Sequence, residues 1–511
     1  MTQKYIEKIL RARVYDVAIE SPLDTAKRLS ARLNNRILLK REDMQPVFSF
    51  KLRGAYNKLY QLSRSTEIKG VIAASAGNHA QGLALAASKL GVKATIVMPK
   101  TTPSIKVESV RSYGAKAVLM GDTYDEAAVY ANEMADRDDL HYIHPYDDPD
   151  VIAGQGTVAV EILRQHPEEI DAIFIPVGGG GLIAGMAAFI KYLRPEVKVI
   201  AVEPADAACF AAAMEKNRRV ELSQVGLFAD GVAVKQIGRE TWRVAKQLVD
   251  EVITVSTDEI CAAIKDIFDD TRSIMEPAGA LGVAGIKKYV SQKQVENQTL
   301  IAINSGANIN FDRLRHVSER AELGEQREGL IGVTIAEEPG SFLRFCRLIG
   351  KKGITEFNYR YSDSSRAHVF VGIQLAEGLT ELNDLIEKLT ARAYPVLSMS
   401  DNEMAKLHVR HMVGGHASRI ENEVLYRFEF PERPGALMDF LAQIGKRWNI
   451  SLFHYRNHGA AYGRVLVGLQ IPPDERKEIK KFLDELGYSG WDESENEAYR
   501  MFLGAGEEGN P

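Results

Sequence analysis

The chain has 511 residues, of which 45% are hydrophobic and 26% are charged, and its formal net charge is -5 at pH 7. A chain of this length exceeds one hydrophobic core and is typical of about two to four domains. The slightly acidic balance gives no positive field for nucleic acid or for an anionic membrane, so we expect neither partner. The cysteines are widely spaced, which excludes a disulfide framework and a zinc finger and is typical of a cytoplasmic protein: Cys209, Cys261 and Cys346.

One apolar segment, Ala172 to Ile190, is long enough to suggest a membrane span because its 19 residues carry no charge. It contains Pro176 and four consecutive glycines, which would break a spanning helix. The pattern instead predicts a buried strand, a glycine loop and a helix. The N-terminal "MTQKYIEKIL" also lacks the apolar core of a signal peptide.

Between residues 35 and 312, short β-branched runs alternate with alanine-rich segments of helical periodicity, such as residues 78–91. This alternation predicts an α/β fold with a mostly parallel sheet covered by helices on both faces. Ligands of such sheets bind at the carboxyl ends of the strands. The predicted strands are residues 36–40, 70–75, 93–99, 115–121, 172–177, 198–203 and 299–305.

The C-terminal third contains an internal repeat, which follows a charged segment that begins near residue 313. The stretch "EEPGSFLRFCRLIGKKGI" (337–354) aligns with "ERPGALMDFLAQIGKRWNI" (432–450) at an offset of 95, and "FNYR" (357–360) aligns with "FHYR" (453–456) at an offset of 96. Each copy reads as strand, Pro-Gly turn, helix, two strands and a second helix. We therefore predict two small βαββαβ units.

Lys51 stands between two phenylalanines and a helix-like run in "VFSFKLRGAYNKLY" (47–60). A buried lysine loses part of its basicity because desolvation disfavours the ammonium. A desolvated lysine is a nucleophile suited to forming a Schiff base. The alternative for a single lysine is that it extends from the start of a helix into water.

Two loops at predicted strand ends are suited to anions. In "ASAGNHAQG" (74–82), a strand enters a turn and then a helix, so N–H groups and a helix dipole can meet a carboxylate, while Asn78 can donate to a phenolate oxygen. An ordinary helix cap is the alternative. In "PVGGGGLIAG" (176–185), successive glycine N–H groups can form a nest for a phosphate.

The second loop also satisfies the pattern G-x-G-x-x-A at Gly179, Gly181 and Ala184, and Glu203 ends the next predicted strand. That arrangement is expected of a dinucleotide fold, so a nicotinamide dehydrogenase is a competing interpretation. A last motif, "INSGANIN" (303–310), closes the final predicted strand. Ser305 there can bond a neutral pyridine nitrogen, or can be a simple loop serine.

Together these motifs resemble the fold-type II pyridoxal-phosphate enzymes, in particular the threonine dehydratases. The resemblance covers nearly the whole chain, through "YDVAIESPL" (15–23), "LLKREDMQPVFSFKLRGA" (38–55), "DGVAV" (230–234), "EPAGA" (276–280) and "NSGAN" (304–308). It implies a catalytic α/β domain of two open twisted subdomains and an α+β regulatory domain of two ACT-like units. The implied bounds are catalytic 1–315, linker 316–326, first regulatory unit 327–400, linker 401–420 and second regulatory unit 421–505.

By this resemblance, Lys51 would attach pyridoxal 5'-phosphate, Phe50 would pack beside its ring, Asn78 would contact its ring oxygen and Ser305 would face its pyridine nitrogen. The expected phosphate loop is Gly178, Gly179, Gly180, Gly181 and Leu182. The residues expected to hold the substrate carboxylate are Ser75, Gly77, Asn78 and His79. Related racemases bind a divalent metal near the position of Glu203, but Cys209 stands where a further ligand is needed, so no metal site is predicted.

The implied reaction is β-elimination of L-threonine to 2-oxobutanoate and ammonia, with L-serine as a second substrate. Isoleucine would inhibit the enzyme and valine would oppose it, in a cytoplasmic homotetramer that serves isoleucine biosynthesis. The expected regulatory residues are Phe342, Tyr359, Arg360, Tyr455 and Arg456. A dehydrogenase with the same amino-acid sensor would leave Lys51, Asn78 and Ser305 unexplained, and a non-catalytic amino-acid-binding protein is a third interpretation.

Overall fold

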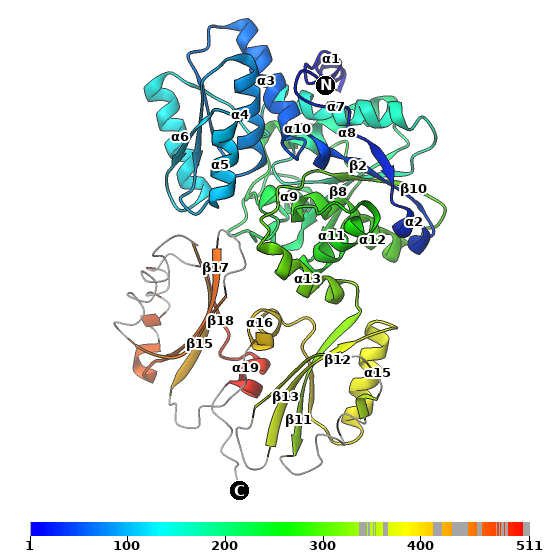
Figure 1. Ribbon diagram of the computed structural model, residues 1–511, viewed down its shortest axis with the longest axis vertical. Helices are drawn as coiled ribbons and strands as arrows, with labels where there is room; N and C mark the ends of the chain where they lie inside the picture. Colours follow the sequence, from blue (N-terminus) through cyan, green and yellow to red (C-terminus); the bar gives the residue numbers. More distant parts are fainter. Residues whose placement is uncertain are drawn as a thin grey trace. The chain divides into compact units, whose positions relative to one another are not determined.

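The computed structural model forms two compact units, residues 1–321 and residues 322–511 (Figure 1). Cys209 and Cys261 are buried, and neither is part of a disulfide. Cys346 lies outside the described residues. The structure describes residues 2–336, 345, 348–350, 352, 354–360, 366–411, 422–431, 448–456, 462–476, 478–479, 481, 485 and 489–503.

The larger sheet of the N-terminal unit has six strands, all parallel except the edge pair β1–β2. Alternate residues of its central strands enter two different cores. Ile301 and Ile303 pack on one face, and Leu300 and Ala302 pack on the other. In order across the sheet, the strands are β1 (Leu23–Thr25), β2 (Arg36–Arg41), β10 (Thr299–Asn304), β7 (Ala172–Pro176), β8 (Lys198–Pro204) and β9 (Glu251–Val255).

The smaller sheet has four strands, all parallel, and it separates a second pair of cores. Val71 and Ala73 of β3 pack with α3 and α4, while Ile72 and Ala74 pack with α6 on the other face. Burial on both faces explains why the two central strands, residues 71–74 and 94–98, read as continuous apolar runs. The strands in order are β5 (Lys116–Leu119), β4 (Ala94–Met98), β3 (Val71–Ala74) and β6 (His141–Tyr142).

Helices cover both sheets, and those of the smaller sheet are coloured blue to cyan in Figure 1. They are α1 (Thr2–Leu10), α2 (Lys27–Leu33), α3 (Lys51–Ser65), α4 (Asn78–Leu90), α5 (Ser104–Ser112), α6 (Tyr124–Asp138), α7 (Pro149–Gln165), α8 (Gly181–Leu193), α9 (Cys209–Lys216), α10 (Arg239–Ala245), α11 (Thr257–Thr271), α12 (Pro277–Lys293) and α13 (Arg313–Gly324). Short 3-10 turns are η1 (Glu42–Met44), η2 (Ala205–Ala207) and η3 (Asp230–Val232).

Each of the seven predicted strands is present, and the helix predicted at residues 78–91 is α4. The uncharged segment Ala172–Ile190 forms β7, the glycine loop and most of α8, as predicted. Within the described residues, none of the helices has the length and apolarity needed to cross a membrane. The predicted linker 316–326 overlaps α13, in which Val317 and Ala321 join the core of the N-terminal unit. The linker bounds stay a prediction.

The C-terminal unit contains two antiparallel four-stranded sheets, one from each repeat (Figure 1). The first is ordered β12 (Ile354–Arg360), β13 (Arg366–Gln374), β11 (Glu328–Ala336) and β14 (Val396–Ser398). The second is ordered β16 (Asn449–Arg456), β17 (Tyr462–Gln470), β15 (Glu423–Pro431) and β18 (Ser489–Asp492). Other described elements are α15 (Leu379–Thr390), α16 (Glu403–Leu407), η4 (Val409–His411), η5 (Pro473–Glu475) and α19 (Glu497–Phe502).

The repeat extends to the details of strand pairing. The register of β12 against β13 shifts between Ile354 and Glu356, and that of β16 against β17 shifts between Ile450 and Leu452, at the same offset of 96 that aligns the sequences. A bulge adds a residue and bends a strand. The two sheets therefore share the position of this irregularity as well as their strand order.

The two repeats share one apolar core. Phe502 of α19, in the second repeat, packs edge-on against Phe370 of β13 in the first, with ring centroids 6.1 Å apart. The caps of the corresponding helices α16 and α19 also meet, since Asn402 Nδ2 donates to Asn496 Oδ1 at 3.1 Å. The repeats thus form one body through their last helices.

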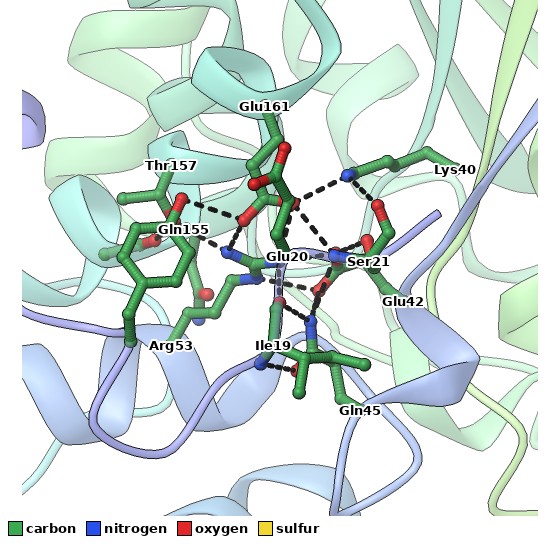
Figure 2. Close-up of polar contacts among 12 residues, drawn as sticks. Ile19, Glu20, Ser21, Lys40, Glu42, Gln45, Arg53, Gln155, Thr157 and Glu161 are labelled. Carbon is green, nitrogen blue, oxygen red and sulfur yellow. Dashed lines mark hydrogen bonds and ion pairs between the residues drawn. The ribbon is translucent and has the colours of Figure 1, made fainter. Parts of the chain in front are cut away.

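Four charged side chains are fully buried together in the N-terminal unit (Figure 2). Arg53 of α3 donates to Glu42 Oε1 at 2.8 Å and to Glu161 Oε1 at 2.6 Å. Lys40 of β2 donates to the other oxygen of Glu161 at 2.6 Å. We call Lys40, Glu42, Arg53 and Glu161 the ionic cluster. It joins the larger sheet to α3 and α7.

The ionic cluster is balanced, because its two carboxylates face two cations. Burial alone would raise the pKa of Glu161, but Arg53 and Lys40 outweigh it and hold that pKa below the usual value. The remaining oxygen lone pairs are also used: Tyr15 donates its hydroxyl to Glu161 at 2.9 Å, and Ser21 donates its hydroxyl to Glu42 at 2.5 Å. A buried ion pair is tolerated when its polar atoms are satisfied in this way.

We predict that Glu161→Gln strongly destabilises the protein, because it leaves Arg53 and Lys40 buried with one carboxylate between them. Loss of one partner of a buried pair costs about 3–5 kcal/mol. The measurement is the thermal midpoint of the N-terminal unit's transition in the full chain, by calorimetry. Lys69→Ala is the control, since Lys69 and Asp139 form an exposed pair at 3.8 Å and should change the midpoint little. Equal midpoints for the two variants would contradict the prediction.

Candidate functional site

Lys51 is the first residue of α3, and two carbonyl contacts fix its position. The preceding residue, Phe50, donates its N–H to the carbonyl of Ser305 at 3.2 Å, which ties the helix start to the end of β10. Lys51 Nζ donates to the carbonyl of Pro145 at 3.1 Å and lies 5.4 Å from the centre of the Phe50 ring. The predicted neighbours Phe50, Lys51 and Ser305 are thus brought together.

The amine of Lys51 is easier to deprotonate than an ordinary lysine. Burial lowers its pKa to about 8, and the carboxyl of Glu276 opposes that effect only in part. Because no carboxylate forms an ion pair with Lys51 among the described residues, its ammonium is held by a neutral carbonyl. Near neutral pH a larger fraction of this amine is therefore unprotonated and nucleophilic than in an ordinary lysine.

The glycine loop lies between β7, which ends at Pro176, and α8, which begins at Gly181. Gly180 has φ of +89°, a left-handed conformation that only glycine adopts freely. A Cβ on Gly179 would lie 2.2 Å from Cγ of the Tyr146 ring, so no larger residue fits there. The first N–H groups of α8 have no partner within the helix, and together with the helix dipole they form an anion site. Leu182 is buried behind this loop.

The segment after β6, "HPYDD" (144–148), connects the lysine to the glycine loop. Pro145 receives the bond from Lys51, and the adjacent Tyr146 lies against Gly179. Asp147 accepts the N–H groups of Arg239 and Glu240 at the start of α10, both within 2.8 Å. Sequence reasoning did not assign this segment. Its position at the carboxyl end of a parallel strand was the available signal.

The turn between β3 and α4 contains the four residues expected at the substrate carboxylate. Ser75 Oγ accepts the N–H groups of Gly77 at 3.3 Å and Ala80 at 3.2 Å, so its own hydrogen remains available for donation. Asn78 begins α4, and the N–H groups of Asn78 and His79 therefore have no carbonyl one turn earlier in the helix. The turn presents donors, as a carboxylate requires.

The imidazole of His79 is not available to bind a substrate carboxylate. Its Nε2 lies 3.0 Å from the carbonyl of Ile143, which accepts only, so Nε2 carries the hydrogen. Burial, with Lys51 adding to it, lowers the pKa of His79 to about 3, and the ring is neutral at neutral pH. Its Nδ1 has no hydrogen to donate. Only the main-chain N–H of His79 is then suited to a carboxylate.

Ser305 and Glu276 lie on adjacent segments beside Lys51. The buried hydroxyl of Ser305 donates to the carbonyl of Ala278 at 3.4 Å. This bond is long, so the hydroxyl can donate instead to a closer acceptor. Glu276 is also buried, and burial raises its pKa to about 7. The sequence showed Glu276 only as part of "EPAGA" and gave it no role. The structure places it beside Asn78, whose amide donates to it at 2.6 Å.

Glu203, on which a dehydrogenase would depend, is used within the fold. It is fully buried, and its two oxygens accept the N–H groups of Phe210 and Ala211 at 2.8 Å each. A ribose could not reach this carboxylate without breaking the cap of α9. Among the residues that the structure describes, no three His, Cys, Asp or Glu side chains gather as metal ligands do.

The site fits pyridoxal phosphate by its own chemistry. It offers the weakly basic amine of Lys51, the buried hydroxyl of Ser305 at a strand end and the amide of Asn78 at the start of α4. It also offers the start of α8, where neighbouring residues lie too close to the preceding glycines for any larger residue to replace them. These groups meet at the carboxyl ends of β3, β7 and β10, the expected position in parallel sheets.

Comparison with known proteins agrees with this chemistry. Residues 14–306 match the family described as pyridoxal-phosphate dependent enzyme, and residues 319–409 and 414–503 match the C-terminal regulatory domain of threonine dehydratase. The biosynthetic L-threonine dehydratase of Burkholderia multivorans is 54% identical over 98% of this chain and 99% of its own length, and that of Salmonella typhimurium is 53% identical over 98% and 97%. This chain belongs to the biosynthetic threonine dehydratases.

A solved member of the threonine deaminases, the processed form of isoform 2 from Solanum lycopersicum, is 51% identical and superposes with a TM-score of 0.62. It covers 63% of this chain and 88% of that one. The match establishes the chain as a pyridoxal-phosphate-dependent threonine dehydratase by family, with the fold-type II catalytic unit and the C-terminal regulatory unit that the resemblance implied. The dehydrogenase interpretation is thereby set aside.

The predicted regulatory residues are only partly placed. Tyr359 and Arg360 lie on β12, and Tyr455 and Arg456 lie on β16, at equivalent register positions of the two sheets. Phe342 lies outside the described residues. The roles of these five residues stay predictions.

We predict that Lys51 of the cofactor-free protein reacts with an acylating reagent with a midpoint of about pH 8, because burial lowers its pKa. An ordinary lysine titrates near about 10.4. The measurement is competitive labelling between pH 6 and 11, followed by mass spectrometry of the peptide that contains Lys51. Lys51→Met is the control that assigns the signal. A midpoint above about 10 would show that the site does not desolvate this amine.

Proposed function

We propose that this chain is a threonine ammonia-lyase that uses pyridoxal 5'-phosphate to convert L-threonine into 2-oxobutanoate and ammonia. The observation that carries the proposal is the weakly basic Lys51, held at the head of α3 next to the segment that contacts the glycine loop. The reaction needs an amine that can both bind an aldehyde and accept a proton near neutral pH. Lys51 meets both requirements.

The cofactor, when bound, supplies an electron sink for the charge left when the α-proton of the substrate departs. Gly178 to Leu182 would hold its phosphate, Asn78 its ring oxygen and Ser305 its pyridine nitrogen. A serine hydroxyl leaves that nitrogen neutral, whereas a carboxylate would keep it protonated. A neutral ring withdraws fewer electrons, which favours rapid loss of the β-hydroxyl over other outcomes.

Lys51 would take the α-proton from the substrate, and its lowered pKa makes the basic form needed for this step more populated than in an ordinary lysine. The substrate carboxylate would rest on the turn before α4, against Ser75 Oγ and the main-chain N–H groups of Gly77, Asn78 and His79. Two of the Ser75 lone pairs are already engaged by N–H groups, so its hydroxyl is fixed as a donor. This arrangement would orient the Cα–H bond toward Lys51.

We predict that Lys51→Ala lowers kcat for L-threonine by at least about 100-fold, since a positioned acid–base group contributes about 100- to 10,000-fold. The measurement follows 2-oxobutanoate and ammonia together. Borohydride treatment should fix the cofactor to the Lys51 peptide of the parent enzyme and to no peptide of the variant. Lys69→Met, a change at an exposed lysine, should retain full activity. Turnover by Lys51→Ala at the parent rate would exclude the proposal.

The C-terminal unit is proposed to bind isoleucine as an inhibitor and valine as its opponent, through the region of Phe342, Tyr359, Arg360, Tyr455 and Arg456. The match to the regulatory domain of threonine dehydratases supports a regulatory role. An effector can shift the enzyme only by its difference in affinity for two states, typically about 1–3 kcal/mol. We further propose L-serine as a second substrate, a homotetrameric assembly and a cytoplasmic location.

We predict that isoleucine makes the threonine saturation curve sigmoidal and raises the half-saturating concentration by about 5- to 150-fold, the range of ordinary coupling energies. Valine should reverse the effect. The measurement is the initial rate over a threonine series with and without each amino acid. A hyperbolic curve that isoleucine leaves unmoved would remove the regulatory proposal and leave the lyase chemistry standing.

A further inference from the structure

The orientation of the Asn78 amide can be deduced from a chain of two hydrogen bonds that ends at the main-chain carbonyl of Val47. Asn308 Nδ2 lies 2.8 Å from the carbonyl oxygen of Val47 and 2.7 Å from Asn78 Oδ1. A carbonyl oxygen only accepts, so the Asn308 atom facing Val47 must be the nitrogen. Both hydrogens of that nitrogen are then used, one on Val47 and one on Asn78. Side-chain amides are assigned from such networks, and here the network allows one orientation.

The same reasoning fixes the other end of the Asn78 amide. Its oxygen accepts from Asn308, so its Nδ2 is the atom that lies 2.6 Å from Glu276 Oε1. An amide nitrogen has two hydrogens, and the bond to Glu276 uses one. The second hydrogen of Asn78 Nδ2 remains for a further acceptor.

Glu276 is itself held firmly. It is 4% exposed, and its main-chain N–H donates to the carbonyl of Gly306 at 3.2 Å. A Cβ on Gly306 would lie 2.7 Å from Glu276 Oε1, so the carboxyl rests directly on that glycine. Glu276 and Asn308 thus approach Asn78 from two segments, 276–278 and 305–308, that also position Ser305.

We propose that Glu276 and Asn308 are positioning residues that fix the Asn78 amide with one N–H directed at the ring oxygen of the cofactor. This inference rests on the proposed function, in which Asn78 contacts that oxygen. Without the two partners, the Asn78 amide could rotate and present its carbonyl oxygen, which would repel an oxygen anion. The polarity of the contact would therefore be set by Val47, Asn308 and Glu276 and not by Asn78 alone.

The test is a double-mutant cycle on the full-length enzyme with pyridoxal phosphate. The variants are Asn78→Ala, Asn308→Leu and their combination, with Glu276→Gln as a conservative change that keeps an acceptor oxygen. Asn57→Ala is the matched control, because Asn57 is a buried asparagine whose amide also donates to a main-chain carbonyl, that of Asp150 at 2.7 Å. Each variant is measured for its cofactor dissociation constant, the position of its visible absorption band, and kcat and KM for threonine.

We expect Asn308→Leu to weaken cofactor binding by about 10-fold, to shift the band in the direction that Asn78→Ala shifts it, and to lower kcat with KM changed less than about 2-fold. The combined variant should be no worse than Asn78→Ala, since residues that act through one another are not additive. Glu276→Gln should retain most of the parent affinity. Asn57→Ala should leave the band unchanged.

Additive effects of Asn308→Leu and Asn78→Ala would overturn the positioning role, as would an equal band shift in Asn57→Ala. An unchanged band and affinity in Asn78→Ala would overturn the contact to be positioned, while continued threonine turnover by the parent would leave the proposed function standing. A parent enzyme without a visible band or turnover would overturn both.

Discussion

The ammonium of Lys51 is partly withdrawn from water where α3 begins, and it donates there to the carbonyl of Pro145. A lysine in this environment loses its proton more easily than an exposed one, and its neutral amine is a nucleophile. The other parts of the site depend on its position. The end of β10 holds Phe50 through Ser305, and the segment after β6 meets both Lys51 and the glycine loop. These groups lie together because they stand at the carboxyl ends of parallel strands in the two sheets.

Much of this arrangement can be predicted from short stretches of the sequence. Four consecutive glycines before an apolar helix pattern can do little other than approach a neighbour closely, and Gly179 and Gly180 do so. The continuous apolar runs identified the central strands because these are buried on both faces. The pattern alone implied one mostly parallel sheet, whereas the strands divide between two. Strand pairing depends on contacts between residues distant in sequence. Only the family resemblance therefore predicted that the strands divide between two subdomains.

Other features could not be predicted because they depend on side-chain direction. Glu276 and Glu203 are both glutamates at element ends, yet one faces Asn78 and the other caps a helix. His79 stands in the predicted substrate turn, but its imidazole bonds Ile143 on the far side. In the regulatory repeats the sequence alignment predicted two equivalent units, and the register shifts of β12 and β16 lie at positions related by the same offset. The helix pairing between repeats had no comparable signal.

The ionic cluster has one further consequence for α3. Its four charges sum to zero and its side chains are closed to solvent, so dissolved salt screens its ion pairs little. Two residues away on α3, Lys51 is the residue proposed to exchange a proton during turnover. The same helix therefore carries, two residues apart, a lysine proposed to change its charge and an arginine whose charge is paired within the ionic cluster, so we expect the start of α3 to stay in place when Lys51 changes protonation.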